Sequence, residues 1–413
     1  MKPPLSLISL FLLNASLAAT ADWPAWRGPN ANGIAEAGQD APVTWSETEN
    51  VVWKSPVPGR GHSSPVVVGE RIFLTTANET ERTQSVIGLD RRTGRRLWQT
   101  EVNRGGFPER IHRKNSHATP TPACDGDRVF VSFFNHGGIQ LAALDLDGDV
   151  VWSKRCGPFK PKYPYGYAPS PLLHGNAVIV ASEFEDGGFL AAFDREDGRE
   201  IWRAPRTATT NYSSPIVAEI SGKEQLLLSG AEKISSFDPN TGELFWAADA
   251  GPKVTAGTVV WTDDLVFASG GFPEKETAAV RADGSGEVVW RKNVKCYEQS
   301  MVVHEGCVYA VDDGGIAYCW KADDGTEMWV KRLGGPISAS PVLADGRIHA
   351  STERGATFVF EAKPGNFESV AENQLGDEAF ATPTICGGRI YLRVAHFDGE
   401  ERRELLYCLG RKS

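Results

Sequence analysis

The sequence predicts an all-β protein, an eight-bladed β-propeller with four-stranded antiparallel blades, on three observations. A glycine stands four residues before a tryptophan at six places: Gly94 and Trp98, Gly148 and Trp152, Gly198 and Trp202, Gly242 and Trp246, Gly286 and Trp290, and Gly325 and Trp329. Recurrence every roughly 40 to 50 residues indicates a fold built from stacked repeats. Short runs of Val, Ile, Phe and Tyr between turn residues are typical of strands. The 43 glycines and 25 prolines supply many turns.

Each repeat follows the same order of elements. In the first repeat, Ser64-Pro65 precedes an apolar run, a turn and a second run, and a third run ends at Asp90. The stretch Leu89–Trp98, "LDRRTGRRLW", is then a turn that leads into a fourth strand carrying the tryptophan. Aspartate bonds backbone amides in such bends, and glycine adopts the backbone angles that other residues resist. The repeated phrase therefore predicts architecture and requires no catalytic role.

Eight repeats open near residues 64, 121, 170, 214, 258, 300, 340 and 382. The fifth lacks its proline, so seven blades are the alternative if this repeat is a long insertion. The seventh has Phe367 where tryptophan is expected, and the eighth stops after its third strand at Leu405–Gly410. The segment Glu49–Val57 has the form of a fourth strand and contains Trp53. We expect it to complete the last blade and close the ring, which removes exposed sheet edges.

The first residues of the chain suggest export. Lys2 and the apolar run Leu5–Leu17 resemble a signal peptide, with small residues up to Ala21 at the expected cleavage site. We therefore predict a signal peptide over residues 1–21, an N-terminal arm over 22–44 and one propeller domain over 45–413. The mature protein is expected in the periplasm or secreted, as a monomer that does not span a membrane.

The charge and the cysteines exclude some classes of function. A net charge of −10 argues against a nucleic-acid partner, since phosphate binding needs concentrated Lys and Arg. The seven cysteines form no CxxC pair, so no zinc or redox motif is predicted. Cys307 and Cys319 flank a tight turn and are the pair that could meet. For most of the cysteines, isolated buried thiols are expected.

The repeat resembles the tryptophan-docking motif of a known family. Ala192-Phe193-Asp194, Gly198 and Trp202 are similar to the motif of quinoprotein dehydrogenases and other pyrroloquinoline-quinone-like propellers. The stretch Trp23–Pro29, "WPAWRGP", resembles an opening signature of an exported bacterial branch of that family. The resemblance covers Trp45 to Gly410 and implies the propeller fold.

The resemblance also implies two kinds of function. Enzyme members carry an adjacent Cys–Cys disulfide and hold Ca²⁺ with Glu, Asn and Asp, with a further Asp as base; this chain has no Cys–Cys pair, and the other positions cannot be assigned. Non-catalytic members include outer-membrane assembly lipoproteins that bind protein partners. The lipidated cysteine of those members is also absent here.

The segments that join the fourth strand of one blade to the first strand of the next are the candidate site. We call them connectors, and we expect them to surround one mouth of the central channel as a ligand funnel. Their polar, aromatic and charged residues are the predicted site: His62, Arg110, Arg113, Asn115, His117, Lys160, Tyr165, Tyr167, Asn211, Tyr212, Lys253, Tyr297 and Gln299.

Two connectors carry positive charge, which includes Arg110, Arg113 and Lys160, and this charge favours an anionic small molecule, a glycan or an acidic protein partner. His62 and His117 occupy equivalent places in neighbouring repeats and could approach each other. No carboxylate accompanies them by spacing, so no metal site is predicted.

The sequence thus favours a binding or scaffolding protein without catalytic residues and without a cofactor. The alternative is an oxidoreductase that uses pyrroloquinoline quinone with calcium to act on alcohols or sugars. A third hypothesis is a lyase or hydrolase acting on polysaccharide, for which His117, Tyr165 and Arg113 could supply the reacting groups.

Overall fold

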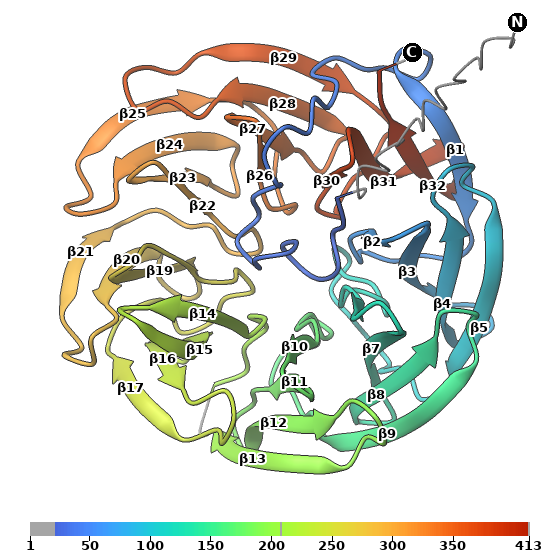
Figure 1. Cartoon of the computed structure of the whole chain (residues 1–413), viewed down its shortest axis with the longest axis horizontal. Helices are drawn as coiled ribbons and strands as arrows, with labels where there is room; N and C mark the ends of the chain where they lie inside the picture. Colours follow the sequence, from blue (N-terminus) through green and yellow to red (C-terminus); the bar gives the residue numbers. More distant parts are fainter. Residues whose placement is uncertain (1–20, 207–208, 412–413) are drawn as a thin grey trace, which may run out of the picture.

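The computed structural model describes residues 21–206 and 209–411; of the predicted signal peptide, residues 1–20 lie outside them. The described chain forms eight four-stranded antiparallel sheets in a ring around a central channel (Figure 1). The predicted eight-bladed propeller is confirmed. No helix in these two ranges is long and apolar enough to cross a membrane.

The first four blades run in sequence order from the channel outward. Blade 1 contains β2 (Val66–Val68), β3 (Arg71–Asn78), β4 (Thr83–Asp90) and β5 (Arg96–Arg104), and blade 2 contains β6 (Ala123–Cys124), β7 (Arg128–Asn135), β8 (Gly138–Asp145) and β9 (Val150–Pro158). Blade 3 contains β10 (Leu172–His174), β11 (Ala177–Ser182), β12 (Gly188–Asp194) and β13 (Glu200–Arg206), and blade 4 contains β14 (Ile216–Ile220), β15 (Lys223–Gly230), β16 (Lys233–Phe237) and β17 (Leu244–Ala248).

Three further blades repeat this order, and the eighth uses both ends of the chain. Blade 5 contains β18 (Val260–Trp261), β19 (Leu265–Gly270), β20 (Glu276–Arg281) and β21 (Val288–Lys292), and blade 6 contains β22 (Val302–His304), β23 (Cys307–Val311), β24 (Ile316–Lys321) and β25 (Glu327–Arg332). Blade 7 contains β26 (Val342–Ala344), β27 (Arg347–Ser351), β28 (Ala356–Glu361) and β29 (Ser369–Gln374), and blade 8 contains β30 (Thr384–Cys386), β31 (Arg389–Asp398), β32 (Glu401–Leu409) and β1 (Val51–Val57). The fifth repeat is a complete blade, which excludes the seven-bladed alternative.

Ring closure occurs as predicted. Strand β1 pairs antiparallel with β32, with Trp53 opposite Cys408 and Val57 opposite Glu404. The N-terminal strand thus forms the outer strand of the last blade, and the ring has no open end between blades 8 and 1.

The repeated Gly–Trp spacing joins neighbouring blades. Trp98 of blade 1 lies against Gly148 of blade 2, where an added Cβ would come 2.5 Å from the indole, and its Nε1 donates to the Leu146 carbonyl at 2.9 Å. Gly148 has a φ of 95°, which a side chain would strain. The same packing recurs from Trp53 to Gly94 and from Trp152 to Gly198. The spacing therefore reflects contact between blades.

The serine and threonine residues that open the repeats form a belt around the channel. In six of them the backbone amide donates to the hydroxyl of the corresponding residue in the next blade, as in Ser64 to Thr121 (3.0 Å), Thr121 to Ser170 (3.0 Å) and Ser300 to Ser340 (2.9 Å). We call these residues the hydroxyl belt: Ser64, Thr121, Ser170, Ser214, Thr258, Ser300, Ser340 and Thr382. The belt explains why a serine or threonine recurs at the opening of each repeat.

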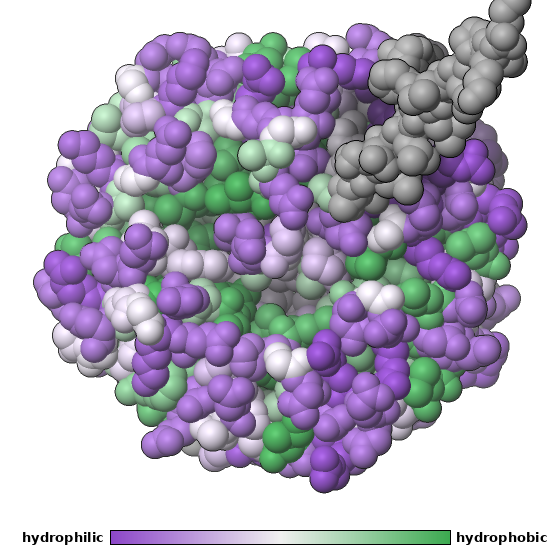
Figure 2. Space-filling model, viewed as in Figure 1, coloured by the Kyte–Doolittle hydropathy of each residue, from purple (hydrophilic) through white to green (hydrophobic). Residues whose placement is uncertain are grey.

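The N-terminal arm, residues 22–44, crosses the end of the channel opposite the connectors. It is the dark blue segment near the centre of the ring in Figure 1. Trp23 pairs with Val67 of blade 1, and Ile34 pairs with Leu343 of blade 7. The fully buried Arg27 donates to the carbonyls of Asn32 (2.7 Å) and Met301 (2.5 Å). Figure 2 shows hydrophilic residues around the margin of the face seen in Figure 1 and hydrophobic residues nearer its centre.

All seven cysteines are buried and free, so Cys307 and Cys319 form no disulfide. Burial raises the pKa of the thiols of Cys124, Cys156 and Cys319 to about 12, which keeps them protonated at pH 8. We expect Ellman's reagent at pH 8 to label no thiol in the native protein and all seven in urea. Titration of five thiols in urea without reductant would instead indicate one disulfide.

Candidate functional site

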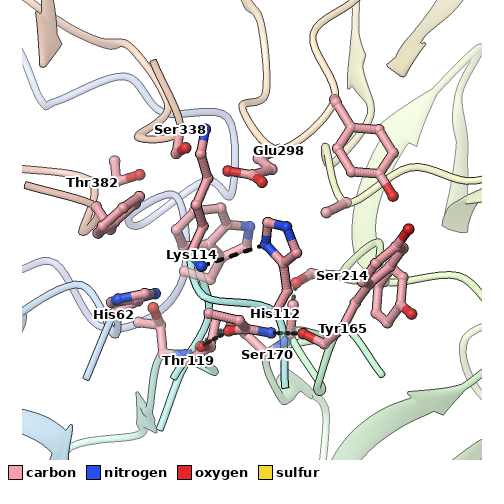
Figure 3. Close-up of a pocket in the computed structure, with 18 of the residues that line it drawn as sticks. His62, His112, Lys114, Thr119, Tyr165, Ser170, Ser214, Glu298, Ser338 and Thr382 are labelled. Atoms are coloured by element: carbon pink, nitrogen blue, oxygen red, sulfur yellow. Dashed lines mark hydrogen bonds between the residues drawn. The ribbon is translucent and has the colours of Figure 1, made fainter. Parts of the chain in front are cut away.

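A cavity of about 350 Å³ lies at the connector mouth of the channel (Figure 3). All eight connectors contribute to it, together with the arm. The cavity is lined by Trp26, His62, His112, Lys114, Asn115, Thr119, Thr121, Tyr165, Ala168, Ser170, Tyr212, Ser214, Ala256, Gly271, Phe272, Lys295, Tyr297, Glu298, Ser338, Phe380 and Thr382. Its volume falls within the range of about 300–1,000 Å³ that is typical of small-molecule sites.

The arm and the hydroxyl belt form the floor of the cavity. The indole Nε1 of Trp26 donates to the hydroxyl of Thr258 at 2.8 Å, from the opposite end of the channel. Thr121, Ser170, Ser214 and Thr382 of the belt also line the cavity. Because Trp26 lies across the channel, the cavity has a floor and opens toward the connectors.

An aromatic wall forms one side. Tyr165 stacks on Tyr163 with ring centroids 5.5 Å apart and lies 6.1 Å from Tyr212. Phe272 meets Tyr163 edge-on at 5.9 Å, and His112 meets Tyr165 edge-on at 5.6 Å. The wall begins in the prolines and tyrosines of "PKYPYGY" (161–167), where the Tyr165 amide donates to the Tyr163 carbonyl at 2.8 Å in a tight turn around Pro164.

Two polar groups buried behind the cavity lining have no partner within the described chain. The hydroxyl of Tyr212, whose residue is 4% exposed, accepts and donates no hydrogen bond. Nε2 of His62 is likewise unpaired, and the ring stacks on Phe380 with centroids 4.6 Å apart. Burial first, and then Arg60, Arg393 and Arg402, hold the pKa of His62 well below its ordinary value. The imidazole is therefore neutral at pH 7.

The cations of the cavity are held by carboxylates. The Lys114 ammonium lies 2.6 Å from Glu353 of blade 7, which also accepts a hydrogen bond from Ser338 at 2.7 Å. Figure 3 shows the side chain of Lys114 extending toward Ser338. The Lys295 ammonium lies 2.9 Å from Asp313. Burial raises the pKa of Glu298, which favours its neutral form. Opposite charges therefore balance around the mouth.

Five of the predicted site residues line this cavity: His62, Asn115, Tyr165, Tyr212 and Tyr297. Asn115 also shapes the mouth, because its amide donates to the Tyr165 carbonyl and so joins two connectors.

Three others among the predicted residues are buried and have structural partners. The hydroxyl of Tyr167 donates to the Ala181 carbonyl at 2.8 Å. Asn211 donates to the Ser229 carbonyl (2.5 Å) and accepts from the Thr255 amide (2.9 Å). Gln299 donates to the Val311 carbonyl at 2.9 Å. These side chains hold the connectors in place and do not line the cavity.

The predicted positive residues Arg110, Arg113, Lys160 and Lys253 are exposed and lie outside the cavity lining. His117 also lies outside it, stacked on Phe107 with centroids 4.1 Å apart, while His62 stacks on Phe380. Within residues 21–206 and 209–411, no three His, Cys, Asp or Glu side chains are grouped as metal ligands.

The sequence reasoning missed several lining residues, among them Trp26, His112, Lys295, Glu298 and Phe272. Trp26 was assigned to the arm, whose path no local pattern reveals. His112, Lys295 and Glu298 lie in or beside connectors that had been searched. Counting every aromatic and polar residue of each connector would have included them.

The fold and cavity define an eight-bladed propeller with a blind channel, and comparison with known proteins gives the family. The profile of a family described as "Outer membrane protein assembly factor BamB" matches residues 33–115, 82–272 and 273–368. The chain belongs to this family of pyrroloquinoline-quinone-like propellers, as its repeats predicted.

Relatives of two kinds are similar in sequence. Outer membrane protein assembly factor BamB from Burkholderia pseudomallei is 24% identical over 352 residues, which cover 76% of this chain and 88% of the relative. A 1-butanol dehydrogenase (quinone) from Thauera butanivorans is 27% identical over 262 residues. These cover 57% of this chain and 38% of the dehydrogenase, so the match spans well under half of that enzyme.

Solved structures show the same fold. BamB from Moraxella catarrhalis superposes with a TM-score of 0.64 at 14% identity, covering 86% of this chain and 99% of that chain. Quinohemoprotein alcohol dehydrogenase from Comamonas testosteroni superposes with a TM-score of 0.68 at 14% identity, covering 97% and 82%. Both kinds of protein share the propeller, and the fold does not choose between them.

Proposed function

We propose that the protein is an exported propeller that binds a ligand or a protein partner at its connector face, without catalysing a reaction. The observation that carries this proposal is the blind cavity at the connector mouth, which all eight connectors line with aromatic and polar side chains.

The relatives and the predicted signal peptide support this proposal. An assembly factor of the outer membrane is matched over most of its length. A connector face that presents loops from all eight blades suits partner binding, since binding residues concentrate on loops held by a rigid scaffold.

The dehydrogenase relatives favour the alternative, an oxidoreductase using pyrroloquinoline quinone and calcium. That quinone is planar and carries three carboxylates. In the cavity Lys114 and Lys295 already pair with Glu353 and Asp313, and the described residues hold no group of three His, Cys, Asp or Glu side chains that could bind a metal ion. The paired lysines offer the quinone carboxylates no free cation, which supports the proposal over this alternative.

Capture from a bacterial envelope extract tests the proposal. We expect the wild-type protein to retain ligands or partners that are lost from a Tyr165→Ala/Tyr297→Ala variant or from an Arg110→Glu/Arg113→Glu/Lys160→Glu variant. The matched control is Arg92→Glu/Arg95→Glu, in the β4–β5 turn on the opposite face, which should retain them.

The same preparations distinguish the alternative. Incubation with pyrroloquinoline quinone and Ca²⁺ should leave no bound chromophore and no reduction of a dye with alcohols or sugars. Dye reduction by the quinone-loaded protein would overturn the proposal. The proposal would also be overturned if the control variant lost its captured ligands or partners to the same extent as the connector variants.

A further inference from the structure

The cavity offers flat aromatic surfaces beside hydrogen-bonding groups. Tyr165, Tyr212 and Tyr297 stand on one side, and Phe380 stands with His62 on another. The indole of Trp26 lies at the floor. Aromatic faces carry partial negative charge and attract the weakly positive C–H groups on the faces of a sugar ring. Planar ring walls around a small blind cavity suit such a ring.

The hydrogen-bonding groups that face the cavity are mostly uncharged. The lining includes the amide of Asn115, the hydroxyl-bearing residues Thr119 and Ser338, and the tyrosines Tyr165 and Tyr297. Hydroxyls of Thr121, Ser170 and Thr382 lie around the floor. A hydroxyl both donates and accepts, so such a set complements a ligand that is itself rich in hydroxyls.

The charges of the cavity leave little for an ionic ligand. Lys114 and Lys295 each face a carboxylate, at 2.6 and 2.9 Å. An anion would have to separate these pairs, and a cation would meet the two ammonium groups. Around the mouth, then, the described side chains favour a neutral ligand over a charged one.

From these features we propose that the cavity binds one or two rings of a neutral sugar, at the end of a glycan or as a free saccharide. This proposal rests on the proposed binding function and narrows it to a class of ligand. The volume of about 350 Å³ is near the lower limit for ligand sites, and Trp26 blocks passage of a polymer through the channel. A terminal ring fits where an internal segment of a chain would not.

Saturation-transfer NMR and calorimetry with glucose, galactose, mannose, N-acetylglucosamine, maltose and cellobiose test this proposal. We expect at least one of them to bind the wild-type protein, and Tyr165→Ala to weaken this binding by about tenfold, because it removes a partly exposed aromatic face from the cavity. Urea denaturation of Tyr165→Ala confirms that the variant is folded in the binding experiment.

The matched control is Tyr167→Phe, which removes a hydroxyl bonded to the Ala181 carbonyl outside the cavity. It should lower the urea midpoint and leave the affinity for sugar unchanged. Comparing the two variants separates a role in binding from a role in folding.

Three results would overturn the sugar proposal: no binding of any of these sugars at millimolar concentration, sugar binding that Tyr165→Ala does not weaken, or tighter binding of glucuronate, citrate or choline at this cavity. None of them removes the proposed binding function, which the capture experiment decides. Quinone turnover would remove that function whether or not a sugar binds.

Discussion

Glu404→Ala is expected to lower the free energy of unfolding by about 3–5 kcal/mol, because it leaves a buried arginine without its counterion. Glu404 lies in β32 opposite Val57 of β1, and its Oε2 accepts from Arg393 Nε at 2.7 Å. Arg393 also donates to the Thr75 carbonyl of blade 1 at 2.8 Å. The network therefore joins blade 8 to blade 1 where the ring closes. Urea denaturation followed by tryptophan fluorescence measures the loss.

Glu401→Ala is the control for this prediction. Glu401 lies in the same strand and pairs with Arg403, but both side chains face solvent. Exposed pairs contribute little, so its urea midpoint should match that of the wild type. Equal midpoints for Glu401→Ala and Glu404→Ala would show that the buried network does not secure ring closure.

Arg27→Ala is expected to release the N-terminal arm and to lower the free energy of unfolding by about 3 kcal/mol. Arg27 is 1% exposed and donates to the Asn32, Met301 and Pro341 carbonyls. Without its guanidinium those carbonyls lose their donor, and Trp26 loses its support at the floor. Chymotrypsin should then cleave after Trp26, which the wild-type fold protects.

Arg92→Ala, at an exposed position in the β4–β5 turn, is the control and should resist chymotrypsin as the wild type does. Resistance of Arg27→Ala to cleavage, with an unchanged melting temperature, would mean that other contacts hold the arm. Gly33 has a φ of 78°, and an added Cβ there would lie 2.6 Å from the Arg27 guanidinium. Gly33→Ala should therefore produce the same release without removing a charge.

The fold was predictable because the signals for it are local and repeated. The Gly–Trp spacing encodes a contact that recurs between blades, so one degenerate repeat does not hide the others. Trp246 is an exception: its Nε1 donates to Gln225 of its own blade, whereas Trp98 and Trp152 donate to the next blade. Blade 5 still forms next to it. The pairing of β1 with β32 was predictable because "ENVVWKSPV" has the form of a fourth strand.

The site was predictable only in part. Tyr165 and Tyr167 were both predicted as site residues because they lie in the same connector. The structure gives them different roles, since Tyr165 lines the cavity and the Tyr167 hydroxyl donates to the Ala181 carbonyl. Polar residues such as Asn211 were needed to satisfy buried backbone groups, and sequence does not distinguish that role from ligand binding.

The remaining features of the site depend on contacts between segments that are far apart in the sequence. Trp26 reaches Thr258 across 232 residues of sequence, and Lys114 reaches Glu353 across 239. Neither pairing follows from spacing. The positive charge predicted for the connectors comes from Arg110, Arg113 and Lys160, whose side chains are exposed and lie outside the cavity.

The pairing of β1 with β32 also imposes an order on biogenesis. The earliest strand to be synthesised must remain without its hydrogen-bonding partner until the ribosome has made the last one. Contacts so distant in sequence form slowly, because a long loop must close first. A chain that lacks the residues from Glu401 onward would leave β1 unpaired and the ring open between blades 8 and 1, and such exposed strand edges favour aggregation.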